Sequence, residues 1–209
     1  MEQKELIHRV LNNSFGRDRI SVIESNLRGA RFLYETKMQE QTFVEGRYTS
    51  NVFSSILLYL IFLEQVGTAF KPKNVNKKND NGIVKALSYF CITEFPLTPN
   101  EKNAIKALRH ALAHGMGLVN SDNRLRNPHK FSLHYFDDEA RKVVQLPNTF
   151  WDGKTFSDKN EDTTTIIYVD NLIKLIEAIY EKLKEENVNN NLELTIDEFE
   201  LKARFTIKT

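Results

Sequence analysis

The sequence contains very little cysteine: Cys91 is the only one among 209 residues. A single cysteine cannot form a disulfide within the chain, and it cannot supply a cysteine-rich zinc cluster. Cys91 lies in the apolar segment 86–92. We therefore expect it to be a buried small hydrophobe rather than a reactive thiol.

A strong excess of charge is also absent, because 29 Lys and Arg residues nearly balance 28 Asp and Glu residues and leave a net charge of +1. The chain as a whole therefore has no electrostatic bias towards nucleic acid or acidic membranes. Hydrophobic residues make up 41% and charged residues 27% of the chain, which is typical of a soluble globular protein with a packed core. The length predicts one domain spanning residues 1–209.

Long apolar runs are missing as well. The most apolar segment, residues 56–63, has eight residues without a polar one, whereas a membrane-spanning helix needs about 20. We expect this segment to be a helix buried in the core or against a second subunit. Residues 1–5 lack the charge order and the apolar segment of a signal peptide, so we expect a cytoplasmic protein without a membrane partner.

Most of the chain shows apolar residues at helical spacing, which predicts a mainly α fold. We expect a helical bundle with its core over residues 19–115 and 170–187, and a small antiparallel β insertion over residues 129–169, before the last long helix. The expected helices cover residues 3–12, 19–41, 48–66, 83–95, 99–114 and 170–186.

The strands are predicted from alternating apolar and polar residues. Residues 131–136 and 142–146 are expected to form an antiparallel pair, and residues 163–169 a further strand. The tail is ambiguous, because residues 199–207 alternate as a strand does whereas residues 195–198 spell a helix-capping box. We favour the strand.

The helix over residues 99–114 has the clearest start. Thr98 is a good N-cap, Pro99 suits the first helical position, and Glu101 completes a capping box. We expect the helix to end near His114, with Gly115 in a left-handed conformation as its C-terminal cap.

The last turns of this helix carry the candidate functional residues Arg109, His110 and His114. Ionised groups are costly to bury unless they are paired. Arginine suits phosphate oxygens, and histidine titrates near neutral pH. The helix dipole favours a cation at a helix C-terminus, so we expect His114 to act as an acid and Arg109 to clamp phosphate. Together these residues are the minimum set needed to cleave a phosphodiester without a metal.

The spelling Arg109-x4-His114, with polar His110 after the arginine and Gly115 after the second histidine, resembles the HEPN superfamily. The resemblance covers residues 108–115 and their helical surroundings. It implies a metal-independent endoribonuclease without a cofactor, acting as a toxin or antiviral-defence effector. It also implies a homodimer whose two motifs form one composite site, and an antitoxin or another partner protein.

Helix geometry supports the composite site. Positions five apart on an α-helix point about 140° apart, so Arg109 and His114 are expected not to share a face, whereas His110 and His114 do. A second copy of the motif across a two-fold axis would supply the missing groups.

Local charge favours RNA as the partner. Residues 102–136 contain six basic side chains and one acidic side chain, a local charge of +5 in a chain of net charge +1. Such a basic patch is what binding to a phosphate backbone requires. The residues predicted to bind RNA are Arg124, Arg126, Lys130 and His129.

Other readings of the motif remain open. His114 could be only a favourable helix-terminal cation, with Arg109 paired to Asp137 or Glu139. The spacing of His110 and His114 suits zinc, but residue 111 is Ala instead of the Glu of metalloproteases, and we expect no metal. At the level of function, the alternatives are a non-catalytic HEPN-like module for nucleotide, RNA or protein binding and dimerisation, and an unrelated helical interaction protein.

Overall fold

The computed structural model describes residues 2–17, 19–39, 50–76, 78, 80–115, 117–121, 127–135, 141–156 and 161–209. The chain divides into two compact units, one formed by residues 1–90 and 178–209 and the other by residues 91–177. The boundary falls within the long helix α6 (Val169–Val188). The protein is mainly α, as the periodicity predicts.

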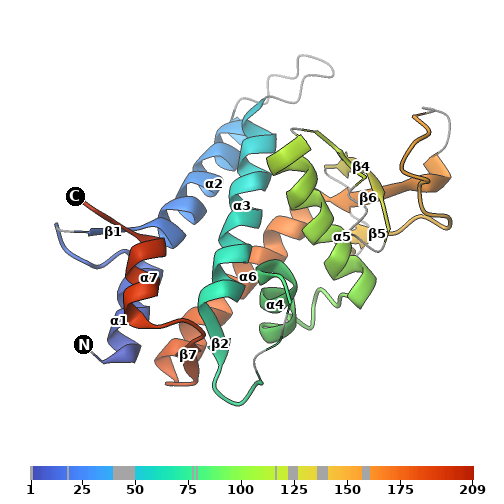
Figure 1. Ribbon diagram of the computed structural model, residues 1–209. Helices are drawn as coiled ribbons and strands as arrows, with labels where there is room; N and C mark the ends of the chain where they lie inside the picture. The colour runs from blue at the N-terminus through green and yellow to red at the C-terminus, as the bar shows by residue number, and fades with distance from the viewer. Residues whose placement is uncertain are drawn as a thin grey trace. The chain divides into compact units, whose positions relative to one another are not determined.

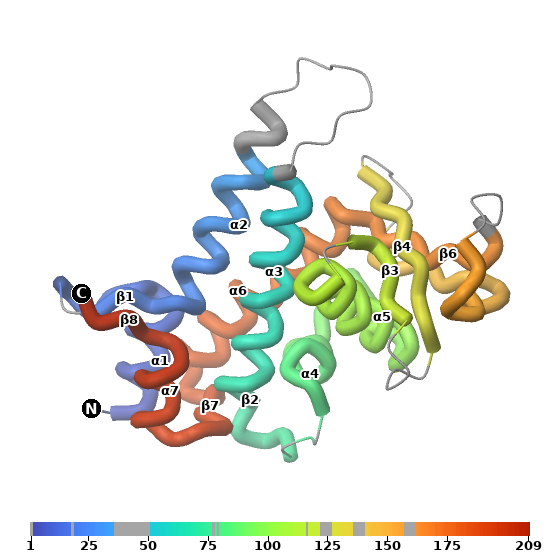
Figure 2. The backbone as a smooth tube through the Cα atoms, turned by 45° about the horizontal axis from the view of Figure 1, so that its top comes forward, coloured from blue at the N-terminus to red at the C-terminus, as the bar shows by residue number. Residues whose placement is uncertain are grey.

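Helices dominate the first unit. Helices α2 and α3 lie side by side in both views (Figures 1 and 2), and Ser55 Oγ donates to the carbonyl of Ala30 between them at 2.8 Å. Helix α3 also packs against α4. The helices wholly in this unit are α1 (Gln3–Asn12), α2 (Val22–Gln39), α3 (Ser50–Ala69), α4 (Gly82–Tyr89) and α7 (Glu198–Phe205).

Two short antiparallel ribbons complete this unit, and their pairings were not expected from the sequence. Strand β1 (Arg19–Ser21) pairs with β8 (Thr206–Lys208), and β2 (Phe70–Pro72) pairs with β7 (Leu192–Leu194). Residues 19–21, which we expected to begin a helix, are therefore extended. Each ribbon joins segments far apart in the sequence, so no local pattern indicates it.

The tail of the chain corrects the strand that we favoured over residues 199–207. Residues 198–205 form helix α7, because Asp197 accepts a hydrogen bond from the backbone N–H of Glu200 at 2.8 Å and caps the helix. Leu201 and Phe205, four apart, are the buried residues of this helix. Only residues 206–208 are a strand.

Helix α3 is longer than the apolar run that predicted it. By length and composition, its stretch Asn51–Ala69 is long and apolar enough to cross a membrane, and it is the one such helix among the described residues. Within the structure, 56% of the most apolar part of this stretch is buried. Core helices of soluble proteins have the same properties. The absence of a membrane partner stays a prediction.

Cys91 is exposed, which corrects its expected burial. Helix α4 ends at Tyr89 instead of residue 95, so Cys91 follows the helix and does not lie on its apolar face.

Two glycines allow α3 and α4 to touch through their backbones. A methyl group on Gly67 would lie 1.8 Å from the carbonyl oxygen of Gly82, and one on Gly82 would lie 2.3 Å from the carbonyl oxygen of Glu64. Backbone atoms at such distances cannot be accommodated by rotating a side chain, so the two helices would have to separate.

Gly67→Ala is therefore expected to lower the free energy of unfolding by about 1–3 kcal/mol, the usual cost of overpacking. Urea denaturation measures this change. Gly29→Ala in α2 is the matched control, because its methyl group would meet only Leu58 Cδ1 at 3.4 Å. Both substitutions replace glycine by alanine within a helix, so both gain the same helix propensity. Equal stabilities of the two variants would show that α3 and α4 are not in backbone contact.

The second unit combines helix α5 with a four-stranded sheet of order β3-β4-β6-β5. Helix α5 packs against β3, β4 and β5 (Figures 1 and 2). Strands β4 and β6 are parallel, and the other neighbours are antiparallel. The elements are α5 (Pro99–His110), the π-helical turn η1 (Ala111–Gly115), β3 (Val119–Asn120), β4 (His129–His134), β5 (Val144–Gln145), the 3-10 turn η2 (Glu161–Thr163) and β6 (Thr164–Tyr168).

The sheet corrects the expected antiparallel pair. Strands were predicted close to the positions of β4, β5 and β6, whereas β3 was not predicted. Strand β6 lies between β4 and β5, and its pairing with β4 is parallel. A parallel pair needs a long crossover connection, which local alternation cannot reveal. The single domain predicted over residues 1–209 stays a prediction.

Candidate functional site

The start of α5 forms as its sequence predicts. Thr98 Oγ1 accepts from the backbone N–H of Glu101 at 3.3 Å, and the Glu101 carboxylate accepts from the backbone N–H of Thr98 at 2.7 Å. Ala104, Ile105, Ala107 and Leu108 are fully buried. Because these positions fill the apolar face, Arg109 and His110 are left on the partly exposed side of the helix.

The end of α5 differs from the expected glycine cap. Residues 111–115 form the π-helical turn η1, in which each backbone hydrogen bond spans five residues instead of four. Gly115 is not among the glycines with positive φ, so the predicted left-handed cap does not form. The backbone N–H of Gly117 instead donates to the carbonyl of Ala111 at 3.3 Å.

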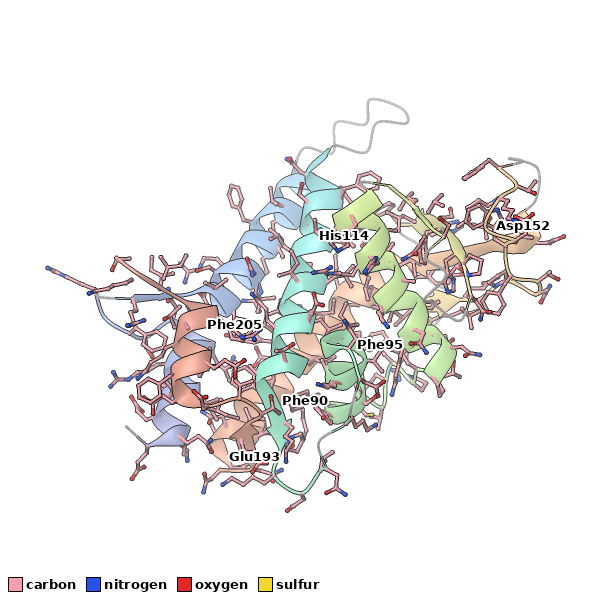
Figure 3. The ribbon with its side chains drawn as sticks, in the orientation of Figure 1. Phe90, Phe95, His114, Asp152, Glu193 and Phe205 are labelled. Carbon is pink, nitrogen blue, oxygen red and sulfur yellow. The ribbon has the colours of Figure 1, made fainter. Side chains whose placement is uncertain are left out.

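This π turn brings together residues that an α-helix would separate. Arg109 Nη1 and His114 Nε2 are 3.1 Å apart, so the expectation that the two side chains point apart is wrong. The expectation for His110 and His114 is correct: their ring centroids are 4.6 Å apart with an interplanar angle of 54°. All three candidate catalytic side chains therefore gather within one chain at the C-terminal end of α5, where Figure 3 labels His114.

The Arg109–His114 contact is a hydrogen bond in only one tautomer of the His114 ring. Guanidinium nitrogens can only donate hydrogen bonds, so Nε2 of His114 must accept. An imidazole that accepts at Nε2 is neutral and carries its proton on Nδ1. In that tautomer His114, which is exposed, holds a lone pair at the nitrogen that faces Arg109.

Sequence reasoning missed Asn120, which is not among its candidate site residues. Asn120 lies in β3, is 5% exposed, and donates from Nδ2 to the carbonyl of Ala107 at 3.0 Å. It therefore reaches the last turn of α5 from the sheet. Nothing in the local sequence indicates this contact.

His129 is buried, which corrects its assignment as an RNA-binding residue. It is 5% exposed, its Nδ1 lies 2.9 Å from Thr165 Oγ1, and its ring stacks on Phe131 and meets the edge of Phe150. Burial lowers the pKa of His129 to about 4. A neutral, enclosed imidazole offers almost no surface to RNA.

Of the residues predicted to bind RNA, the structure describes only His129 and Lys130. Lys130 is the neighbour of His129 in β4, and successive residues of a strand point to opposite faces. Lys130 therefore lies on the sheet face opposite to His129. The other two residues predicted to bind RNA, Arg124 and Arg126, lie outside the described residues. The carboxylates considered as partners of Arg109, Asp137 and Glu139, also lie outside them.

Within the part of the chain that the structure describes, no group of three His, Cys, Asp or Glu side chains is placed to hold a metal ion. Comparison with protein-family models, curated proteins and solved structures finds no match.

Proposed function

We propose that the protein is a metal-independent endoribonuclease of the HEPN type, a toxin or antiviral-defence effector with a HEPN-like helical bundle. The observation that carries the proposal is the contact of Arg109 Nη1 with His114 Nε2 at 3.1 Å, beside the ring of His110. One permanent cation and two imidazoles meet at a partly exposed helix end, which is where a phosphodiester could approach them.

The proposed reaction uses the 2′-hydroxyl of RNA as an internal nucleophile. His114 Nε2 takes the proton of this hydroxyl, and the oxygen attacks the adjacent phosphorus to form a 2′,3′-cyclic phosphate. Protonated His110 gives its proton to the departing 5′-oxygen, and Arg109 stabilises the negative charge of the phosphorane. His114 takes up one proton and His110 releases one, so the step needs no further reactant.

This assignment changes the role expected for His114 from acid to base. The helix dipole favoured a cation at residue 114, whereas the hydrogen bond from Arg109 requires an unprotonated Nε2. When a phosphate takes over the donors of Arg109, the lone pair of His114 becomes available to the substrate.

We also propose a cytoplasmic homodimer with the helices over residues 99–114 near its axis, and an antitoxin or another partner protein. The dimer is supported by the resemblance alone, because Arg109 and His114 already meet within one chain. Arg124, Arg126 and Lys130 remain proposed contacts to the RNA backbone.

Incubation of the protein with single-stranded RNA in EDTA tests the function. We expect cleavage that leaves cyclic phosphate and 5′-hydroxyl ends, because the 2′-hydroxyl is the nucleophile. The same oligonucleotide with deoxyribose throughout is the control and should stay intact. Loss of cleavage in EDTA would refute the metal-independent mechanism, and RNA binding without cleavage would favour the non-catalytic binding module.

A further inference from the structure

The contact between Arg109 and His114 depends on the junction between α5 and the π turn η1. If α5 continued as an α-helix to residue 114, the two side chains would point about 140° apart. In η1 the wider turn closes this gap, and Arg109 Nη1 comes within 3.1 Å of His114 Nε2. Whatever holds the junction therefore controls the geometry of the site.

The backbone at this junction departs from regular helical bonding. The N–H of Ala111, the residue at which α5 passes into η1, is shared between the carbonyls of Ala107 and Leu108. The carbonyl of Ala107 also accepts from Asn120 Nδ2 at 3.0 Å. A side chain that enters the hydrogen-bond ladder in this way is a recognised cause of local helix distortion.

Asn120 reaches the junction from a fixed position. It is buried in β3, and its cross-strand partner in β4 is His129. His129 is in turn enclosed by Phe131 and Thr165. Because the sheet anchors Asn120, its amide can hold the carbonyl of Ala107 without following the motions of the helix end.

We infer that Asn120 is a positioning residue, which holds the π turn in the form that places Arg109 against His114. The consequence for RNA cleavage rests on the proposed function, whereas the consequence for the protonation site of His114 does not. Two independent readouts therefore separate failure of this inference from failure of the proposed function.

The first readout is the nitrogen NMR spectrum of the His114 ring in the full chain. In the unaltered protein, we expect the neutral form of the ring to carry its proton on Nδ1, because Nε2 accepts from Arg109. In Asn120→Ala the turn relaxes, the contact with Arg109 is lost, and the proton distributes over both ring nitrogens. This measurement needs no RNA and decides the inference even if the protein has no nuclease activity.

The second readout is the kinetics of RNA cleavage. Misplaced catalytic groups lower the rate of the chemical step by about 10-fold to 10²-fold, so kcat of Asn120→Ala should fall while KM changes little.

Asn171→Ala is the matched control within the same unit. Asn171 is also buried and donates from Nδ2 to a backbone carbonyl, that of Lys142, at 2.8 Å. Both variants lose one buried side-chain hydrogen bond, so their melting temperatures should fall by similar amounts. Only Asn120→Ala should change the His114 spectrum and kcat. Equal changes in both variants, or an unchanged His114 spectrum in Asn120→Ala, would overturn the inference.

A second pair of variants keeps the inference testable if Asn120→Ala does not fold. Asn120→Ser retains a small polar side chain but is too short to reach Ala107, so the same two readouts apply. Deletion of Ala113 shortens the spacing from Arg109 to His114 from five residues to four. A regular α-helix places residues four apart on one face. In that background, the histidine spectrum should no longer depend on Asn120. A spectrum that still changes would show that Asn120 does not act through the π turn.

Discussion

His114→Ala and Arg109→Ala are each expected to reduce the rate of RNA cleavage by at least about 10²-fold, the usual effect of losing an acid–base group or a contact to transition-state charge. In the proposed mechanism, the first variant removes the lone pair that accepts the 2′-hydroxyl proton, and the second removes the cation that faces the phosphorane. Single-turnover cleavage of a labelled RNA, with enzyme in excess, measures the chemical step directly.

His8→Ala is the control for these variants, because His8 is an exposed histidine of the other unit and should leave the rate unchanged. Arg109→Lys should restore only part of the activity, since an ammonium group lacks the planar donors of a guanidinium. Exposed His114 contributes little packing, so the melting temperature of His114→Ala should hardly change. If alanine at 109 and at 114 each unfolds the protein, the motif has a structural role instead.

The protein is expected to lose about 3 kcal/mol of stability through one residue, His129, between pH 6.5 and pH 4. Burial lowers the pKa of His129 in the folded state to about 4, whereas the unfolded chain binds this proton near pH 6.5. Between these values the unfolded state binds more protons, so the free energy of unfolding falls as the pH falls. The contribution is fully present above pH 6.5.

Urea denaturation at several pH values measures this effect by comparing the unaltered protein with His129→Gln, which cannot titrate. The difference in stability between the two should decrease by about 3 kcal/mol from pH 7 to pH 4, while carboxylates common to both cancel. His8→Gln, which alters an exposed histidine, is the matched control and should leave this pH dependence in place. A difference that is constant with pH would mean that His129 is not held in a dehydrated site.

The loop beside His129 should persist through this pH range. Its Phe150 meets the edge of the His129 ring, and Asp152, labelled in Figure 3, organises the following turn. The Asp152 carboxylate accepts from the hydroxyl of Thr155 and from the backbone N–H groups of Thr155 and Lys154, and these bonds lower its pKa to about 2. Asp152 therefore stays ionised at pH 4, and the titration reports on His129.

The sequence by itself determined the features that depend on neighbours along the chain. The capping box at Thr98 and Glu101 joins groups three residues apart, so both its presence and the start of α5 could be predicted. The helices over 3–12, 50–69 and 169–188 follow from apolar residues at helical spacing. The spacing of Arg109, His110 and His114 was likewise sufficient to select these residues as candidates.

The tertiary structure alone decided how those candidates meet. The π turn that brings Arg109 to His114 is held by Asn120, a residue of the sheet, and no periodicity along α5 reveals a hydrogen bond that arrives from another element. The burial of His129 and the position of β6 between β4 and β5 depend on pairings between segments distant in sequence. Local propensity cannot specify such pairings, because their stability comes from contacts that exist only once the chain has folded.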